Sequence, residues 1–194
     1  MEINKAIQIV KTQLRKERFE HTIRVLDTAE ELANRFDVPV EEVKLAAVFH
    51  DYAKHRPLDE LKSGIISSDL PMDLLDYHSE LWHGPVGAIL VEGEQGITDK
   101  NILSAIHYHT TGKANMNKLE MIVYLADYIE PGREFKGLDE VRKASKSDLQ
   151  YACWIVARNT INHLVRKEAT VYPDSIHAYN DFTRIIKRRD KSNG

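Results

Sequence analysis

The chain has 194 residues, of which 42% are hydrophobic and 29% carry a charged side chain. This composition is ordinary for a folded protein and excludes a largely disordered one, and the length suffices for one hydrophobic core. The formal net charge of −3 gives no reason to expect a nucleic-acid polymer as a partner. A small anion would still bind where cationic side chains or a metal ion cluster locally.

Cys153 is the only cysteine in the chain, which excludes an internal disulfide and a cysteine-rich zinc site. It lies in an apolar segment, so we expect a core residue in a reducing compartment. No apolar run approaches the roughly 20 residues of a membrane span, and the N-terminus lacks the basic-then-apolar pattern of a signal peptide. We therefore expect a cytoplasmic protein without a membrane partner.

Apolar residues recur at helical spacing along nearly the whole chain, and no run has the period of two that is typical of strands. The predicted fold class is therefore all-α, a single helical bundle over residues 1–194. A short basic tail, Lys187 to Lys191, is expected to be solvated and frayed. Asn117 and Glu120 predict an N-terminal cap for the helix that carries Asp127. The other helices are expected over residues 3–14, 17–36, 40–51, 58–67, 72–76, 86–91, 98–109, 138–144, 148–167 and 173–188, with a turn over 93–96.

Four side chains that can bind a metal ion lie in or next to these apolar helices. His50 and Asp51 close an apolar run, His21 shares the inward face of Val25, and Asp127 interrupts another apolar stretch. Buried polar groups of this kind must be paired or bound to something, because an unpartnered buried charge is costly. The four residues together predict a metal site.

The ligand types restrict the choice of metal. Two imidazoles with two carboxylates and no thiolate suit iron, manganese, cobalt or nickel at an octahedral site with positions open to water. Zinc is less suited, because structural zinc prefers cysteine. A metal with bound water can supply hydroxide near neutral pH and polarise a phosphoryl oxygen. We expect one ion, because no additional carboxylate is evident near the other candidate histidines.

Two further histidines are candidates for the same site. His83 begins the helix marked by Gly84-Pro85, and His109 shares the inward face of its helix, whereas His107 points to a different face. The remaining four are expected to be structural or surface residues: His55, His78, His163 and His177.

The ordered set of His21, His50-Asp51 and Asp127 resembles the HD superfamily of metal-dependent phosphohydrolases. Five segments, over residues 18–25, 46–54, 83–88, 106–112 and 125–133, look more specifically like the YqeK family, and the similarity covers nearly the whole chain. No ligand position departs from the family pattern. The resemblance implies an HD-domain bundle that cuts diadenosine tetraphosphate symmetrically into two ADP with an iron-type metal.

Residue roles follow as expectations. Asp51 would hold the metal with His21, His50 and Asp127, and would also orient or deprotonate the attacking water, although a carboxylate bound to a cation is a weak base. His83 and His109 would contact phosphate oxygens or protonate the leaving ADP, because histidine titrates in the useful range. The three are the candidate catalytic residues: Asp51, His83 and His109.

Cationic side chains near the ligands should complete a site for the phosphate chain, and the resemblance makes the helix connection over residues 170–175 a candidate base-and-ribose site. Tyr128, next to Asp127, is either a substrate contact or a core residue. The candidate substrate-binding residues are Arg18, His21, Lys54, His83, His109, Tyr128, Arg133, Thr170, Val171, Tyr172, Pro173, Asp174 and Ser175.

Three alternatives stay open. The metal set also suits other HD phosphohydrolases, which act on deoxynucleoside monophosphates, guanosine tetraphosphate or cyclic dinucleotides. A nucleotide sensor would bind such ligands without turnover, although a pure binder has no need of a water-activating metal. A structural helical protein with incidental histidines is the third. The sequence also leaves a homodimer open.

Overall fold

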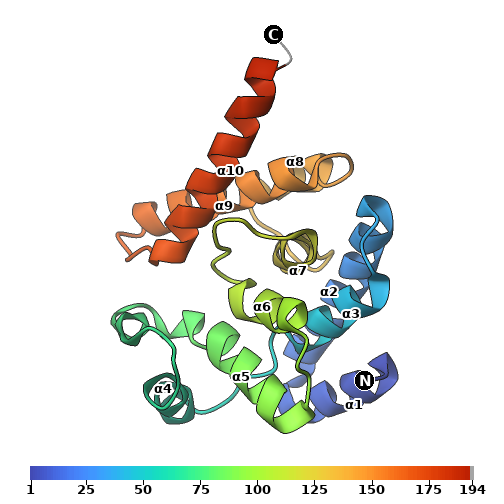
Figure 1. Cartoon of the computed structure of the whole chain (residues 1–194), viewed down its shortest axis with the longest axis vertical. Helices are drawn as coiled ribbons and strands as arrows, with labels where there is room; N and C mark the ends of the chain where they lie inside the picture. Colours follow the sequence, from blue (N-terminus) through green and yellow to red (C-terminus); the bar gives the residue numbers. More distant parts are fainter. Residues whose placement is uncertain (193–194) are drawn as a thin grey trace.

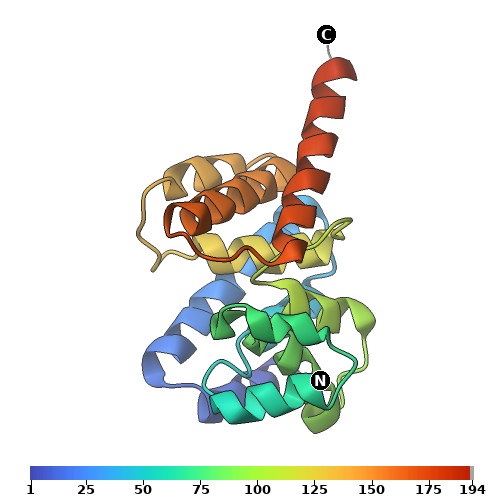
Figure 2. The same ribbon diagram turned by 90° about the vertical axis from the view of Figure 1, so that its left-hand side faces the viewer.

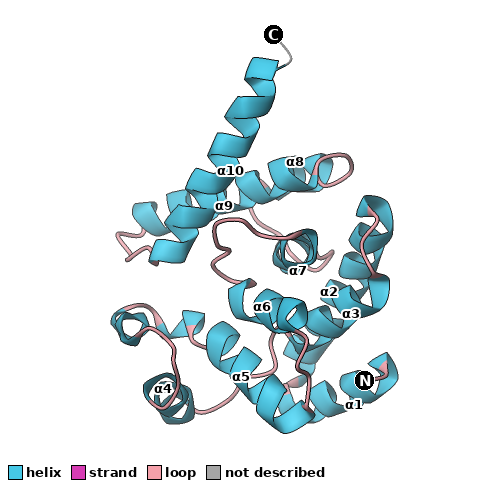
Figure 3. Cartoon of the chain, in the orientation of Figure 1, coloured by secondary structure: helices cyan, strands magenta, loops and turns pink. Residues whose placement is uncertain are grey.

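The computed structural model describes residues 1–192 of the chain. Within that range it contains ten α-helices, two short 3-10 helices and no strand, which confirms the all-α prediction. Figure 3 shows the helices joined by short connections.

The helices follow one another along the chain with these bounds: α1 Ile3–Gln13, α2 Lys16–Phe36, α3 Val40–Phe49, α4 Leu58–Ile66, the 3-10 helices η1 Met72–Asp76 and η2 Ser79–Leu81, α5 His83–Gln95, α6 Lys100–Tyr108, α7 Lys118–Ile129, α8 Leu138–Ala144, α9 Leu149–Arg166 and α10 Pro173–Ser192.

Side-chain caps fix where several helices begin. The Asp99 carboxylate accepts from two N–H groups of the first turn of α6, and the Asp148 carboxylate caps α9 by accepting from the Tyr151 N–H. At α7 the expected capping box is present: the Asn117 side chain accepts from the Glu120 N–H, and the Glu120 side chain accepts from the Asn117 N–H. These bonds satisfy backbone donors that a helix start leaves unpaired.

Two expectations for helix ends are wrong. The predicted turn over 93–96 is shorter, because α5 continues through Gly93 and ends only at Gly96, whose φ of +67° is the left-handed conformation that glycine adopts readily. The basic tail is also helical, since α10 runs to Ser192. Arg189 donates to Asp148 at 2.9 Å and so ties the end of α10 to the start of α9.

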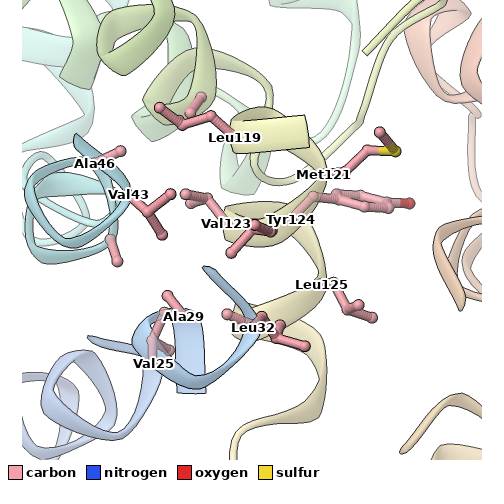
Figure 4. Packing of buried hydrophobic residues seen from close by; sticks show 14 of the residues in the cluster. Val25, Ala29, Leu32, Val43, Ala46, Leu119, Met121, Val123, Tyr124 and Leu125 are labelled. Atoms are coloured by element: carbon pink, nitrogen blue, oxygen red, sulfur yellow. The ribbon is translucent and has the colours of Figure 1, made fainter. Parts of the chain in front are cut away.

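Helix α7 is the centre of the bundle. Figures 1 and 2 show α8, α9 and α10 gathered on one side of α7, and α1 to α6 on the other, with the far end of α10 projecting outwards. Every residue of α7 from Leu119 to Ala126 is buried, as expected of a helix that is apolar all round. In the close view of Figure 4, Val43 of α3 and Val25 of α2 approach Val123 of α7 from two directions.

The main hydrophobic cluster extends from Ala6 in α1 to Phe182 in α10. A second, smaller cluster packs α4 and η1 against the start of α5, and it includes Tyr172 from the connection between α9 and α10. Among residues 1–192, none of the helices is both long and apolar enough to cross a membrane.

The central position of α7 predicts a large cost for shortening its side chains. Leu125 is fully buried, so Leu125→Ala should lower the free energy of unfolding by roughly 2–5 kcal/mol. Urea unfolding followed by circular dichroism measures the change. Leu58→Ala is the matched control, because Leu58 is 59% exposed and its truncation should change stability little. Equal effects of the two substitutions would contradict the placement of α7.

Candidate metal centre

The centre is built at the end of α3. The apolar residues that precede His50 bury this end of the helix, and the chain turns tightly there, with the Tyr52 N–H donating to the Phe49 carbonyl and the Lys54 N–H to the Asp51 carbonyl. Both His50 and Asp51 are 0% exposed. The polar dipeptide therefore lies inside the protein, as its sequence context indicates.

Two other helices bring further ligand-capable atoms to this dipeptide. The Nε2 atom of His21, on α2, lies 2.9 Å from Asp127 Oδ1 and 3.7 Å from Asp51 Oδ2. His50 Nε2 lies 2.9 Å from Asp51 Oδ2 and 3.9 Å from Asp127 Oδ1. His21, His50 and Asp51 offer ligand atoms close enough to hold one ion, and Asp127 borders them.

A second group shares Asp51. His83 is the first residue of α5 and His109 follows α6, and their Nε2 atoms lie 3.1 and 3.9 Å from Asp51 Oδ1. These three residues also offer ligand atoms close enough for an ion. The carboxylate that faces these two histidines is the second oxygen of Asp51, which the first group already uses, so this second group brings no additional carboxylate of its own.

The orientation of each imidazole is fixed by its other ring nitrogen. The Nδ1 atoms of His50, His83 and His109 contact the backbone carbonyls three residues earlier in the chain, at 2.7, 2.6 and 2.7 Å. A carbonyl can only accept, so each Nδ1 carries a proton and donates it, and the Nε2 atom of each ring is turned to the centre. Partners of this kind are usual for metal-binding histidines.

Three of the ligand-capable atoms at the centre receive no hydrogen bond. His21 Nε2, His50 Nε2 and Asp51 Oδ1 are buried and have no hydrogen-bond partner, although carboxylate oxygens lie close to all three residues. The Nε2 atoms of His83 and His109 also face each other at 3.0 Å. Buried acceptors that face one another are costly, and a cation placed among them removes that cost. The residues present therefore fit a divalent metal ion.

Charge keeps both carboxylates of the centre ionised. Burial would raise the pKa of Asp51, but His50, His83 and Arg18 hold it well below its usual range. Burial opposes the charge of Asp127 as well, and His21, His50 and Arg133 hold its pKa well below the usual range. Two permanent negative charges in a closed site favour a cation.

The pKa values of His109 and His50 are shifted in opposite directions. Burial, together with the neighbouring His83 and His50, holds the pKa of His109 well below its usual value, which keeps that ring neutral. Burial would also lower the pKa of His50, but Asp51 and Asp127 outweigh it and raise the value. A metal ion and a proton therefore compete for His50 Nε2, so metal binding weakens as the pH falls.

Glu130 is a part of the centre that the sequence did not indicate. It is 1% exposed, and its Oε1 lies 3.0 Å from His21 Nδ1, so that it accepts the proton there. Its Oε2 accepts from Arg24 Nε and from the Gly132 N–H, both at 2.6 Å. Burial would raise the pKa of Glu130, but Arg24, His21 and the Gly132 N–H lower it to about 2. Glu130 thus orients His21, as the backbone carbonyls orient the other histidines.

One weak signal could have pointed to Glu130. A carboxylate at the C-terminal end of a helix is disfavoured by the helix dipole, and Glu130 stands there, followed by Pro131-Gly132. An added Cβ at Gly132 would lie 2.5 Å from Arg24 Nε, so a side chain there would push the Arg24 guanidinium away from Glu130.

The predicted cationic residues surround the two carboxylates. Arg18 forms an ion pair with Asp51, and Arg133 Nη2 lies 2.8 Å from Asp127 Oδ1. Lys54, one turn beyond Asp51, instead pairs with Glu80 at 2.6 Å. Arg18 and Arg133 thus border the centre directly.

The stretch over residues 170–175 lies at the His83 and His109 end of the centre. Tyr172 packs edge-on against Tyr77, with ring centroids 4.9 Å apart, and Ser175 is buried. Tyr172 and Asp174 line a cavity of about 70 Å³ with Pro85 and Thr111, each two residues from one of these histidines. The other positions are exposed or half-buried: Thr170, Val171, Pro173 and Asp174.

The remaining histidines lie outside the centre. His107 stacks on Tyr108, and burial with the nearby Lys113 lowers its pKa to about 4. The His55 ring accepts from the Arg15 N–H at 3.1 Å. Three are exposed, as expected of surface residues: His78, His163 and His177.

Comparison with known proteins gives a consistent result. A model of the HD domain matches residues 18–132. The chain is 47% identical over 180 residues to the symmetrical bis(5'-nucleosyl)-tetraphosphatase of Bacillus subtilis, covering 93% of this chain and 97% of that protein. It is 39% identical over 190 residues to the protein of the same name from Staphylococcus aureus, covering 97% and 98%. The crystal structure of a predicted HD superfamily hydrolase involved in NAD metabolism from Clostridium acetobutylicum superposes with a TM-score of 0.89, at 36% identity, covering 95% of this chain and 98% of that one.

The contact between Glu130 and His21 predicts a loss of metal affinity on substitution. Glu130→Gln removes the charge that stabilises the His21 Nδ1–H, and metal affinity should fall by roughly 10- to 100-fold. Titration with Co²⁺, followed by its visible absorption, measures this. Glu134→Gln is the control, because Glu134 is exposed on the same segment. Equal affinity of the two variants would show that Glu130 does not support His21.

Proposed function

Because the chain belongs to the HD domain family, we propose that it hydrolyses dinucleoside tetraphosphates symmetrically with the help of a bound divalent metal. The match to the HD domain and to near full-length tetraphosphatases confirms the resemblance seen in the sequence. The observation that carries the proposal is the convergence of buried, unpartnered acceptors from His21, His50 and Asp51. The enzyme is thus a phosphoanhydride hydrolase, and its substrate is diadenosine tetraphosphate or a close analogue.

The reaction breaks the central bridge of the tetraphosphate. Water adds its hydroxyl group to one of the two middle phosphorus atoms, and its proton ends on the bridging oxygen of the leaving nucleoside diphosphate. With adenosine at both ends, the products are two molecules of ADP. No other co-reactant is needed.

We assign the metal to His21, His50, Asp51 and Asp127. When bound, the metal supplies Lewis-acid activation of the phosphate chain and lowers the pKa of water. Asp51 remains ionised and directs one oxygen to each group of histidines, so it also orients the attacking water. The ligand set favours iron, with manganese, cobalt and nickel as substitutes.

His83 and His109 form a pair suited to moving a proton. Their Nε2 atoms lie 3.0 Å apart, a distance at which one proton is shared between two nitrogen atoms. Such a pair can donate to the leaving ADP oxygen and recover the proton from water. The alternative role of His83 and His109 is to bind a second metal ion together with Asp51. The number of metal ions in the purified chain, one or two, distinguishes proton transfer from metal binding.

Arg18, Lys54 and Arg133 provide positive charge for the four phosphates. Arg18 and Arg133 are paired with Asp51 and Asp127, the two carboxylates assigned to the metal. Once a cation neutralises those carboxylates, both guanidinium groups become available to phosphate oxygens, which they can contact in a bidentate manner. Phosphate binding and metal binding therefore support each other.

The nucleosides complete the proposed contacts. We place one nucleoside against Thr170, Val171, Tyr172, Pro173, Asp174 and Ser175, at the His83 and His109 end of the centre. The buried Cys153 suits a reducing compartment, so we place the enzyme in the cytoplasm.

The assignment predicts a single product. The chain loaded with iron, cobalt or manganese should convert diadenosine tetraphosphate to ADP alone, as resolved by anion-exchange chromatography. ATP with AMP would mean asymmetric cleavage and would overturn the proposal. Faster turnover of a deoxynucleoside monophosphate, guanosine tetraphosphate or a cyclic dinucleotide would favour another HD activity. Tight binding without turnover would favour a sensor.

The ligand assignment predicts coupled losses of metal and activity. Asp51→Ala should remove the bound metal and lower kcat/KM by roughly 10³-fold or more, while the helical content measured by circular dichroism stays nearly unchanged. Metal analysis of the purified variant gives a readout that does not depend on activity. Asp69→Ala is the control, because Asp69 is exposed. Normal hydrolysis by the Asp51 variant would refute the four-ligand site.

A further inference from the structure

A cavity of about 600 Å³ is lined by Tyr128, the chain neighbour of Asp127, and by none of the residues assigned to the metal, the phosphates or the 170–175 stretch. Its walls come from the end of α7, the loop before α8 and the second half of α9. This volume is in the range of roughly 300–1,000 Å³ that is typical of small-molecule sites. The residues that bear on its chemistry are Tyr128, Phe135, Lys136, Asn159, Asn162 and Arg166.

The cavity begins next to a proposed metal ligand. Tyr128 directly follows Asp127 in α7. Arg133 reaches back from the α7–α8 loop to Asp127 Oδ1 at 2.8 Å, and Phe135 comes two residues later, a chain distance of about 7 Å. In Figure 2 this loop lies at the left-hand edge of the molecule, below α8 and α9. A group held at Asp127 therefore has a short path into the cavity.

The opposite end of the centre leads to a different recess. The ligand atoms follow one another from Asp127 and His21 through Asp51 to His83 and His109. The narrow cavity with Tyr172 is lined by Pro85 and Thr111, each two residues from His83 or His109, whereas the large one is lined by Tyr128, which follows Asp127 in the chain. The centre thus has a recess at each end.

The walls of the large cavity suit a nucleoside. Phe135 is 44% exposed, unusual for a phenylalanine, and packs edge-on against Tyr128 with ring centroids 5.0 Å apart, which leaves aromatic surface for a base to stack on. Asn159 and Asn162 offer amide groups on the opposite wall, and Lys136 and Arg166 add positive charge. The Asn159 side chain already has two partners, because its Oδ1 accepts from Arg158 Nε at 3.2 Å and it also hydrogen-bonds Tyr128. Asn162 is therefore the amide that the wall offers to a ligand.

We propose that this cavity binds the second nucleoside of the symmetrical substrate, on the far side of the cleaved bridge from the nucleoside at residues 170–175. The inference rests on the proposed function and deepens it. A substrate with a nucleoside at each end of four phosphates, cut at the centre, needs one recess on each side of the metal. The structure provides a cavity of small-molecule size on the Asp127 side and the 170–175 stretch with its narrow cavity on the other side.

The test compares the full substrate with one that lacks the second nucleoside. For the manganese-loaded chain, the KM of diadenosine tetraphosphate is compared with the Ki of adenosine 5'-tetraphosphate as a competitor. The ratio of Ki to KM should be roughly ten or more in the wild type, because stacking of one base on an aromatic ring raises the affinity by about tenfold or more. In Phe135→Ala and in Asn162→Leu, which alter opposite walls, the ratio should fall to about one.

Tyr151→Ala is the matched control, because Tyr151 is also a partly exposed ring with one aromatic neighbour, Trp154, but lies outside the cavity. It should keep the wild-type ratio. The inference is overturned if both cavity variants, folded by circular dichroism, keep that ratio, or if the wild-type ratio is already one. ADP as the sole wild-type product would leave the proposed function standing in either case. No hydrolysis by the wild type would refute both the proposed function and this inference.

Discussion

The group of buried acceptor atoms at the end of α3 is the constraint on which the rest of the structure depends. His50 and Asp51 are fully buried, and no neighbour donates to His50 Nε2 or Asp51 Oδ1. Folding brings these groups together at a cost that a cation offsets. Helices α2, α5, α6 and α7 must therefore each deliver a side chain to within a few ångströms of one turn, and the packing around α7 holds them there.

The four imidazoles are oriented by two different means. Three of them donate to a carbonyl of the preceding turn, a bond that any histidine at a helix end can make locally. His21 lies inside α2, where the backbone carbonyls already accept hydrogen bonds from the next turn of the helix. The orientation of its ring therefore depends on Glu130, at the end of another helix. The position of His21 is consequently the one that relies on correct tertiary packing, whereas the other three are nearly fixed once their helices form.

These two kinds of contact also explain how much could be predicted from the sequence. Helical periodicity and caps are local, so the all-α class, most helix bounds and the inward faces of His21, His50, His109 and Asp127 follow from spacing alone. Contacts between distant segments do not. No local pattern indicates that Asp51 turns its second oxygen to His83, that Glu130 supports His21, or that Arg189 pairs with Asp148. The cavity at Phe135 cannot be predicted from local patterns either, because its walls come from three separate segments of the chain.

The carboxylate of Glu130 also holds the Gly132 N–H, and with it the beginning of the loop that carries Arg133 and Phe135. The two ends of this loop are therefore held differently. Its first residues are tied through Glu130 to His21, while Phe135 and Lys136 are exposed and line the large cavity. Phe135 and Lys136 can thus be exchanged to reshape the cavity while the hydrogen bonds that orient His21 stay in place, which makes these two positions the natural target for redesigning the cavity.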